Sequence, residues 1–152
     1  MKDVERTITV PVPLSAVWEY LTDFTHTEQW DPPTERTQLV LANGQDGKGE
    51  GTVYRNTSSM LGNSTEVTYT VTEYVPQQRF QLRGDASAMQ LLDTITFAGD
   101  ETTTTVTYHA EFHPQGAAKL VEPLLPLGLK RIGDKTADQL EETLRSLPST
   151  DA

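Results

Sequence analysis

Regular alternation of apolar and polar residues over most of the chain limits the folds it can adopt. From residue 34 to residue 113, β-branched and aromatic residues alternate with polar ones, and turn formers such as Asn43-Gly44 and Gly99-Asp100 interrupt the alternation. This pattern is typical of successive antiparallel hairpins. It predicts six strands, at residues 34–42, 50–60, 64–75, 79–84, 89–98 and 102–113.

The segments on either side of this meander complete an α+β pattern. Residues 4–10 alternate as a further strand, and Pro11 and Pro13 end it before an apolar helical stripe that includes Trp18. A second short helix is expected around residues 26–30. The period then changes after Pro114, where helical spacing predicts one long C-terminal helix through Leu129, Ile132, Thr136, Leu140 and Leu144. The prolines at 123 and 126 predict a kink or a separate short helix before this long helix. The segment that contains them is a candidate lid over a pocket.

Length and composition narrow the class of protein. A chain of 152 residues is the size of one domain, which we place at residues 1–147, followed by a flexible tail at 148–152. There are no cysteines, which suits a reducing cytoplasm. The formal net charge of -10 disfavours nucleic-acid binding, and no run approaches the roughly 18 apolar residues of a membrane span. We therefore expect a cytoplasmic protein without stable membrane insertion, as a monomer or a homodimer.

Several segments carry a resemblance to a known family. They are residues 8–13 (ITVPVP), residues 16–23 (AVWEYLTD), Trp30-Asp31-Pro32, residues 71–76 (VTEYVP) and residues 105–108 (TVTY). In this order they resemble the START-like (SRPBCC) superfamily of polyketide cyclase/dehydrase type. The resemblance implies a helix-grip fold, in which a curved seven-stranded antiparallel sheet surrounds the long C-terminal helix, with two short helices after the first strand. It also implies a cavity for a hydrophobic small molecule.

The alternation along the strands nominates residues for the wall of such a cavity. Side chains two residues apart share a face of the sheet, so Tyr69 and Tyr108 should join apolar neighbours there and offer hydroxyl groups to a ligand. The alternative is that these residues form ordinary core. The candidates for a ligand pocket are Trp30, Tyr69, Phe80, Leu82, Met89, Leu91, Tyr108, Phe112, Leu124 and Leu129.

The histidines do not predict a metal site. His109, Glu111 and His113 alternate along one strand and so share a face. The opposite face carries the apolar side chains Val106, Tyr108, Ala110 and Phe112, which places the histidines on the solvated side. We therefore expect neither a metal nor a cofactor. No other spacing in the chain predicts a catalytic constellation.

Three functions stay open at this point. The first is a carrier or binding protein for an apolar small molecule. The second is a cyclase or dehydrase that positions a folded substrate and shuttles protons, for which only Tyr69 and Tyr108 can be nominated. The third is a protein-interaction module of the chaperone-cofactor type, which would show a sizeable exposed apolar patch. The ligand's identity lies in the shape of the cavity and not in a motif.

Overall fold

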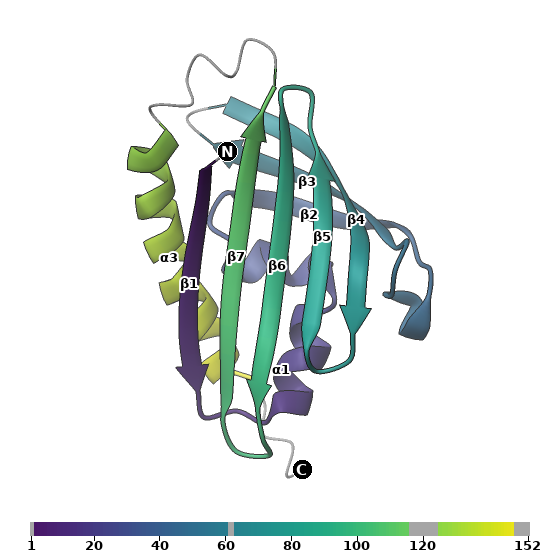
Figure 1. The fold of residues 1–152 in the computed structure, drawn as a ribbon, viewed down its shortest axis with the longest axis vertical. Coiled ribbons are helices and arrows are strands. Elements are labelled where there is room, and N and C mark those ends of the chain that lie inside the picture. Colours follow the sequence, from purple (N-terminus) through teal and green to yellow (C-terminus); the bar gives the residue numbers. More distant parts are fainter. Residues whose placement is uncertain (1, 61–62, 116–124, 148–152) are drawn as a thin grey trace.

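The computed structural model describes residues 2–60, 63–115 and 125–147, without the side chains of Lys2, Met60, Asn63 and 125–129. The proposed tail at 148–152, Pro123 and Leu124 lie outside these ranges. The described elements are β1 (Lys2–Val10), α1 (Leu14–Leu21), η1 (Phe24–His26), α2 (Thr27–Trp30), β2 (Thr34–Leu41), η2 (Gln45–Gly47), β3 (Val53–Met60), β4 (Asn63–Val75), β5 (Arg79–Asp85), β6 (Met89–Gly99), β7 (Thr104–Pro114) and α3 (Leu125–Arg145) (Figure 1).

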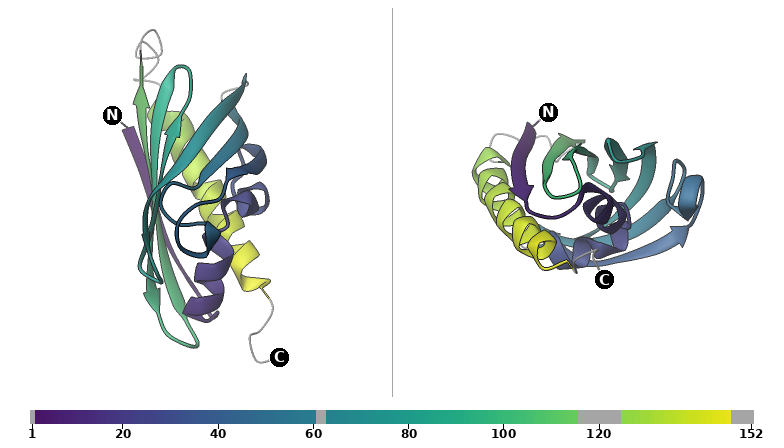
Figure 2. Two further views of the ribbon diagram at one scale, coloured as in Figure 1. Left: turned by 90° about the vertical axis from the view of Figure 1, so that its right-hand side faces the viewer. Right: turned by 90° about the horizontal axis from the view of Figure 1, so that it is seen from below.

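The described strands form one antiparallel sheet in the order β1-β7-β6-β5-β4-β3-β2. Five of its six pairings are hairpins between consecutive strands, and the sixth places β1 beside β7. The sheet curves into an arc, with α1 inside the arc and α3 across its open side (Figure 2). The predicted helix-grip fold is confirmed: a curved seven-stranded antiparallel sheet, two short helical segments after the first strand, and a long C-terminal helix packed on the sheet.

Residues 125–145 form one helix, α3. The short helix predicted to precede it falls on residues 116–124, which lie outside the described residues. Pro126 is the second residue of this helix. Backbone amides in the first turn have no acceptor inside a helix, so a proline there removes no hydrogen bond.

A glycine lets α3 lie directly on β1. A Cβ atom added at Gly133 would lie 2.4 Å from Cγ2 of Val4, which is closer than real atoms approach. Next to it, Nη2 of Arg6 lies 3.0 Å from the Asp134 carboxylate, joining strand and helix by an ion pair. Further along the helix, Leu140 and Leu144 are buried. The close approach at Gly133 therefore determines how near α3 comes to the sheet.

Aromatic side chains fill the half of the arc that lies under α1. Trp18 of α1 packs edge-to-face on Phe97 of β6, with ring centroids 4.9 Å apart, and on Tyr74 of β4, at 5.2 Å. Phe80 of β5 and Phe24 complete the cluster. Since α1 covers this half of the concave face, it is packed as ordinary core. The other half is covered by α3.

Candidate ligand cavity

A cavity of about 310 Å³ lies between the sheet and α3. One wall is the concave face of the sheet, including Val67 and Tyr69 of β4, Leu91 and Asp93 of β6, and Ala110 and Phe112 of β7. The opposite wall is α3, through Ile132, Gly133 and Thr136. Asp31 and Pro33, from the connection between α2 and β2, and the turn between β5 and β6 form the rest of the lining. The volume is at the lower end of the range for small-molecule pockets.

Half of the candidate pocket residues line this cavity. They are Tyr69, Met89, Leu91, Tyr108 and Phe112. Each lies on β4, β6 or β7 and points to the concave face, as the alternation along the strands predicts. Tyr69 is buried, whereas Met89 and Tyr108 are partly exposed.

Three other candidates do not line the cavity. Phe80 and Leu82 are completely buried on β5, on the concave face but outside the cavity, with Phe80 in the aromatic cluster under α1. Trp30 is 1% exposed and packs edge-to-face on Tyr108, with ring centroids 5.7 Å apart. Trp30 therefore packs against the lining residue Tyr108 without lining the cavity itself. The two remaining candidates are not described: Leu124 lies outside the described residues, and only the backbone of Leu129 is described.

Gly84 makes room for the Tyr69 ring. The two residues are directly opposite each other on β4 and β5. A Cβ atom at position 84 would lie 2.8 Å from Cε1 of Tyr69 and 2.9 Å from Cγ1 of Val67. Because glycine has no side chain, the tyrosine ring can lie across β5 instead of standing away from it.

The sequence analysis missed Asp93, a buried carboxyl in the cavity wall. This residue lies on β6 between Leu91 and Ile95, and its side chain is only 4% exposed. Burial and, to a smaller extent, the negative charge of Asp31 together raise its pKa from 3.8 to about 8. The signal was present in the sequence, because Asp93 has the same alternation parity as Met89, Leu91, Ile95 and Phe97.

A second carboxyl, Asp31, lines the cavity from the end of α2. Its Oδ2 accepts a hydrogen bond of 2.6 Å from the Thr34 hydroxyl. Burial raises the pKa of Asp31 to about 6, although this hydrogen bond acts in the opposite direction. The sequence analysis quoted Asp31 only as part of a family segment and gave it no role.

Two phenols lie with these carboxyls. Tyr108 lies beside Asp93, because the two residues are diagonal neighbours: Asp93 is directly opposite Ala110 on β7. Burial, and then the charges of Asp93 and Asp31, raise the pKa values of Tyr69 and Tyr108 well above 10. The cavity therefore has a polar end that combines two carboxyls and two phenols, groups that can hydrogen-bond to a ligand or exchange a proton with one.

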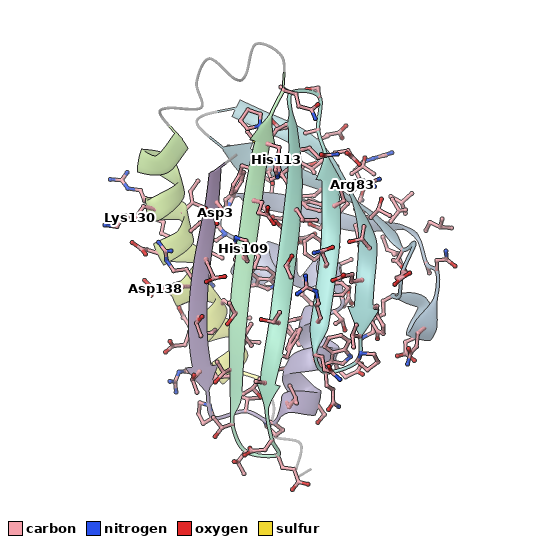
Figure 3. The ribbon with its side chains drawn as sticks, viewed as in Figure 1. Asp3, Arg83, His109, His113, Lys130 and Asp138 are labelled. Carbon is pink, nitrogen blue, oxygen red and sulfur yellow. The ribbon has the colours of Figure 1, made fainter. Side chains whose placement is uncertain are left out.

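The histidines lie away from this site. Nε2 of His109 is 2.9 Å from the carboxylate of Asp3, and Figure 3 shows Asp3, His109 and His113 together on the outer face of the sheet. Within the described ranges, no group of three or more His, Asp or Glu side chains is placed to hold a metal ion. No described helix is long and apolar enough to cross a membrane.

The curved sheet, the two short helices and the long C-terminal helix define a helix-grip domain with a cavity between sheet and helix. The chain belongs to the family described as polyketide cyclase / dehydrase and lipid transport, which matches residues 1–145. No curated protein sequence matches it.

Solved structures show the same fold at low sequence identity. The ZhuI aromatase/cyclase from Streptomyces sp. R1128 has a TM-score of 0.75 and 19% identity, over 94% of this chain and 93% of that one. A protein from Thermus thermophilus has a TM-score of 0.76 and 15% identity, over 94% and 97%. A START superfamily protein from Mycobacterium smegmatis has a TM-score of 0.64 and 16% identity, over 93% and 98%.

Proposed function

We propose that the chain binds a small, mainly apolar molecule with a polar group, in the cavity between the sheet and α3. The observation that carries this proposal is the cavity of about 310 Å³, whose wall combines apolar side chains with hydroxyl and carboxyl groups. Pockets of this composition bury the body of a ligand by the hydrophobic effect and orient it by a few hydrogen bonds. The family description, which includes lipid transport, supports the same class of ligand.

Filling the cavity should weaken binding. Ala110 is 1% exposed and lies in the cavity wall, directly opposite Asp93 on β6 and Val4 on β1. Leucine at this position would extend into the cavity and occupy part of the volume that a ligand needs. We expect Ala110→Leu to weaken uptake of the neutral apolar dye Nile red by about tenfold or more, which corresponds to roughly 1.4 kcal/mol. Fluorescence titration measures this change.

The matched control is Ala98→Leu, the same substitution at an exposed position of β6. It should bind the dye like the original chain. Native mass spectrometry of the purified protein adds an independent test, because a retained small molecule appears as a mass increase that denaturation removes. If the original chain takes up no dye and retains no small molecule, or if both alanine variants bind equally, the cavity is not a binding site.

A second candidate function is catalysis of the cyclase or dehydrase type. The observation that favours it is Asp93 beside Tyr108, because a carboxyl with a pKa of about 8 can both donate and accept a proton near neutral pH. The structural likeness to an aromatase/cyclase is compatible with such chemistry. Incubation with a bound ligand separates the two candidates: a carrier returns the ligand unchanged, and an enzyme returns a product.

The interaction-module hypothesis has less support. Among the residues whose side chains are described, the exposed large apolar ones are Leu39, Val40, Leu41 and Val75. Three of these are consecutive on the edge strand β2, and neighbours on a strand point to opposite faces. They therefore do not combine into one broad patch of the kind that marks an interface.

A further inference from the structure

We infer that the ligand carries a basic amine, bound as an ammonium group between Asp31 and Asp93 at the polar end of the cavity. This inference rests on the proposed function and specifies its ligand class. Both carboxyls line the same cavity, and they are close enough for the charge of one to act on the other. A cation placed there is attracted by both carboxylates.

The described lining contains no opposite charge. None of the described residues in the cavity wall is a lysine, an arginine or a histidine. The nearby cation Arg6 is held elsewhere, by the carboxylate of Asp134 and the carbonyl oxygen of Glu5. On the neighbouring strand β5, Arg83 pairs with Asp85. Among the described residues, therefore, no cationic side chain compensates the charge of the cavity carboxyls.

The available hydrogen-bond acceptors match the donors of an ammonium group. Asp31 accepts one hydrogen bond from Thr34, and Asp93 lies beside the Tyr108 phenol. A carboxylate has about four acceptor positions, so both groups can accept further bonds. A primary ammonium has three donors, and the rings of Tyr69 and Tyr108 add aromatic faces that attract a cation. The apolar side chains of the wall can then enclose the body of the molecule.

Other ligand charges fit less well. An anionic ligand would add negative charge next to two carboxyls, at a cost in Coulomb energy. A neutral ligand would not compensate the two effects that raise the pKa of Asp93, which are burial and the charge of Asp31. Asp93 would therefore stay protonated. An ammonium group supplies the compensating charge that the described protein groups do not. This distinction makes the inference testable with ligands of one shape.

Tryptamine, tryptophol and indoleacetate provide such a set, because they share an indole body and differ in an ammonium, a hydroxyl or a carboxylate. We expect tryptamine to displace Nile red at a concentration at least about tenfold lower than tryptophol, because close charge pairs contribute upwards of about 1.4 kcal/mol. Indoleacetate should be the weakest of the three. Fluorescence competition at neutral pH gives the order.

Replacing a single carboxyl should reduce the preference. Asp93→Asn keeps the shape of the side chain and removes its charge, so the preference for tryptamine over tryptophol should fall several-fold in this variant, with Asp31 supplying the remaining attraction. The control Asp138→Asn makes the same change at an exposed position of α3 and should keep the preference. Circular dichroism establishes that each variant is folded. If Asp93→Asn does not fold, Asp31→Asn carries the test, and it should reduce the preference several-fold.

The pH dependence provides a second readout. The groups that face Asp93 are Tyr108 from β7, Tyr69 from β4 and Asp31 from the end of α2. Among its described side chains, α3 contributes the uncharged Ile132, Gly133 and Thr136. An alkylammonium stays charged up to about pH 10. Ionisation of Asp93 should therefore strengthen tryptamine binding several-fold from about pH 6 to about pH 8. Tryptophol binding should weaken or stay constant over that range.

The outcomes distinguish this inference from the proposed function. If Nile red binds and tryptophol competes as well as tryptamine, or if none of the three indoles competes, the amine inference is wrong and the binding function stands. If the chain takes up neither the dye nor any of the indoles, both fail. Equal preference for tryptamine in Asp93→Asn and in the original chain also overturns the inference.

Discussion

Replacing Phe80 with alanine is expected to lower the free energy of unfolding by about 3–5 kcal/mol. The Phe80 side chain is completely buried, and its ring centroid lies 6.2 Å from that of Tyr74 and 6.4 Å from those of Trp18 and Phe24. The substitution removes the central ring from this cluster and leaves a void that rigid neighbouring rings fill poorly. Chemical denaturation followed by circular dichroism measures the loss.

Val75→Ala is the matched control for this prediction. Val75 ends β4 and is 40% exposed, so its truncation should change the stability by no more than about 0.5 kcal/mol. The folded fraction of Phe80→Ala should still bind Nile red like the original chain, because Phe80 lies outside the cavity. A loss below about 1 kcal/mol would contradict the role of Phe80 in the core, and a selective loss of dye binding would place it in the site.

The fold could be predicted from the sequence because the two-residue period of the strands and the helical period of the C-terminal segment are both clear. Alternation over residues 34–113 and helical spacing after Pro114 correspond to β2–β7 and α3. Boundaries were less accurate: the third strand begins at Val53, three residues later than predicted, because the preceding segment around Gly44 and Gly51 has positive backbone φ angles and forms turns. Glycines adopt such angles without strain, which alternation alone does not reveal.

The candidate site was only partly predictable. Alternation identifies which side chains point to the concave face, and Tyr69, Leu91 and Phe112 line the cavity accordingly. It does not reveal which half of that face α1 covers, so Phe80 and Leu82 were included although they lie outside the cavity. That information depends on how a helix distant in the sequence packs on the strands.

Asp93 was missed for a different reason. Alternation predicts apolar residues at the inward positions of the strand, and a carboxyl at one of these positions does not fit that pattern. A charged residue at an inward position of a strand is unusual, since burial of an unpaired charge is costly. Such an exception marks a candidate site, and here it coincides with the cavity wall. Asp31 follows a short helix and has no strand parity that would show its direction.

The stability of the chain should decrease as the pH rises from about 6 to about 8. Burial raises the pKa of Asp93 from 3.8 in the unfolded chain to about 8 in the folded one. Between these values the folded state holds a proton that the unfolded state lacks, so each pH unit lowers the free energy of unfolding by up to about 1.4 kcal/mol. Over the stated range the decrease attributable to Asp93 is about 2 kcal/mol, which denaturation at several pH values measures.

The choice of pH range separates the two carboxyls. Asp31 also has a raised pKa, of about 6, so it adds to the decrease mainly at lower pH, whereas above about pH 6 Asp93 dominates. Asp93→Asn should therefore lose about 2 kcal/mol less than the original chain between about pH 6 and about pH 8. Asp138→Asn should keep the original pH dependence. An unchanged slope in Asp93→Asn would mean that Asp93 is ionised in the folded chain at neutral pH.

The same measurement links stability to the inferred ligand. A bound ammonium favours the ionised form of Asp93 and so lowers its pKa in the folded state. With saturating tryptamine, the stability should therefore fall less between about pH 6 and about pH 8. The reason is that the folded chain then holds less of a proton in excess of the unfolded chain. Tryptophol should leave the slope unchanged or make it steeper. A ligand that stabilises the chain equally at both pH values does not contact the carboxyl through a positive charge.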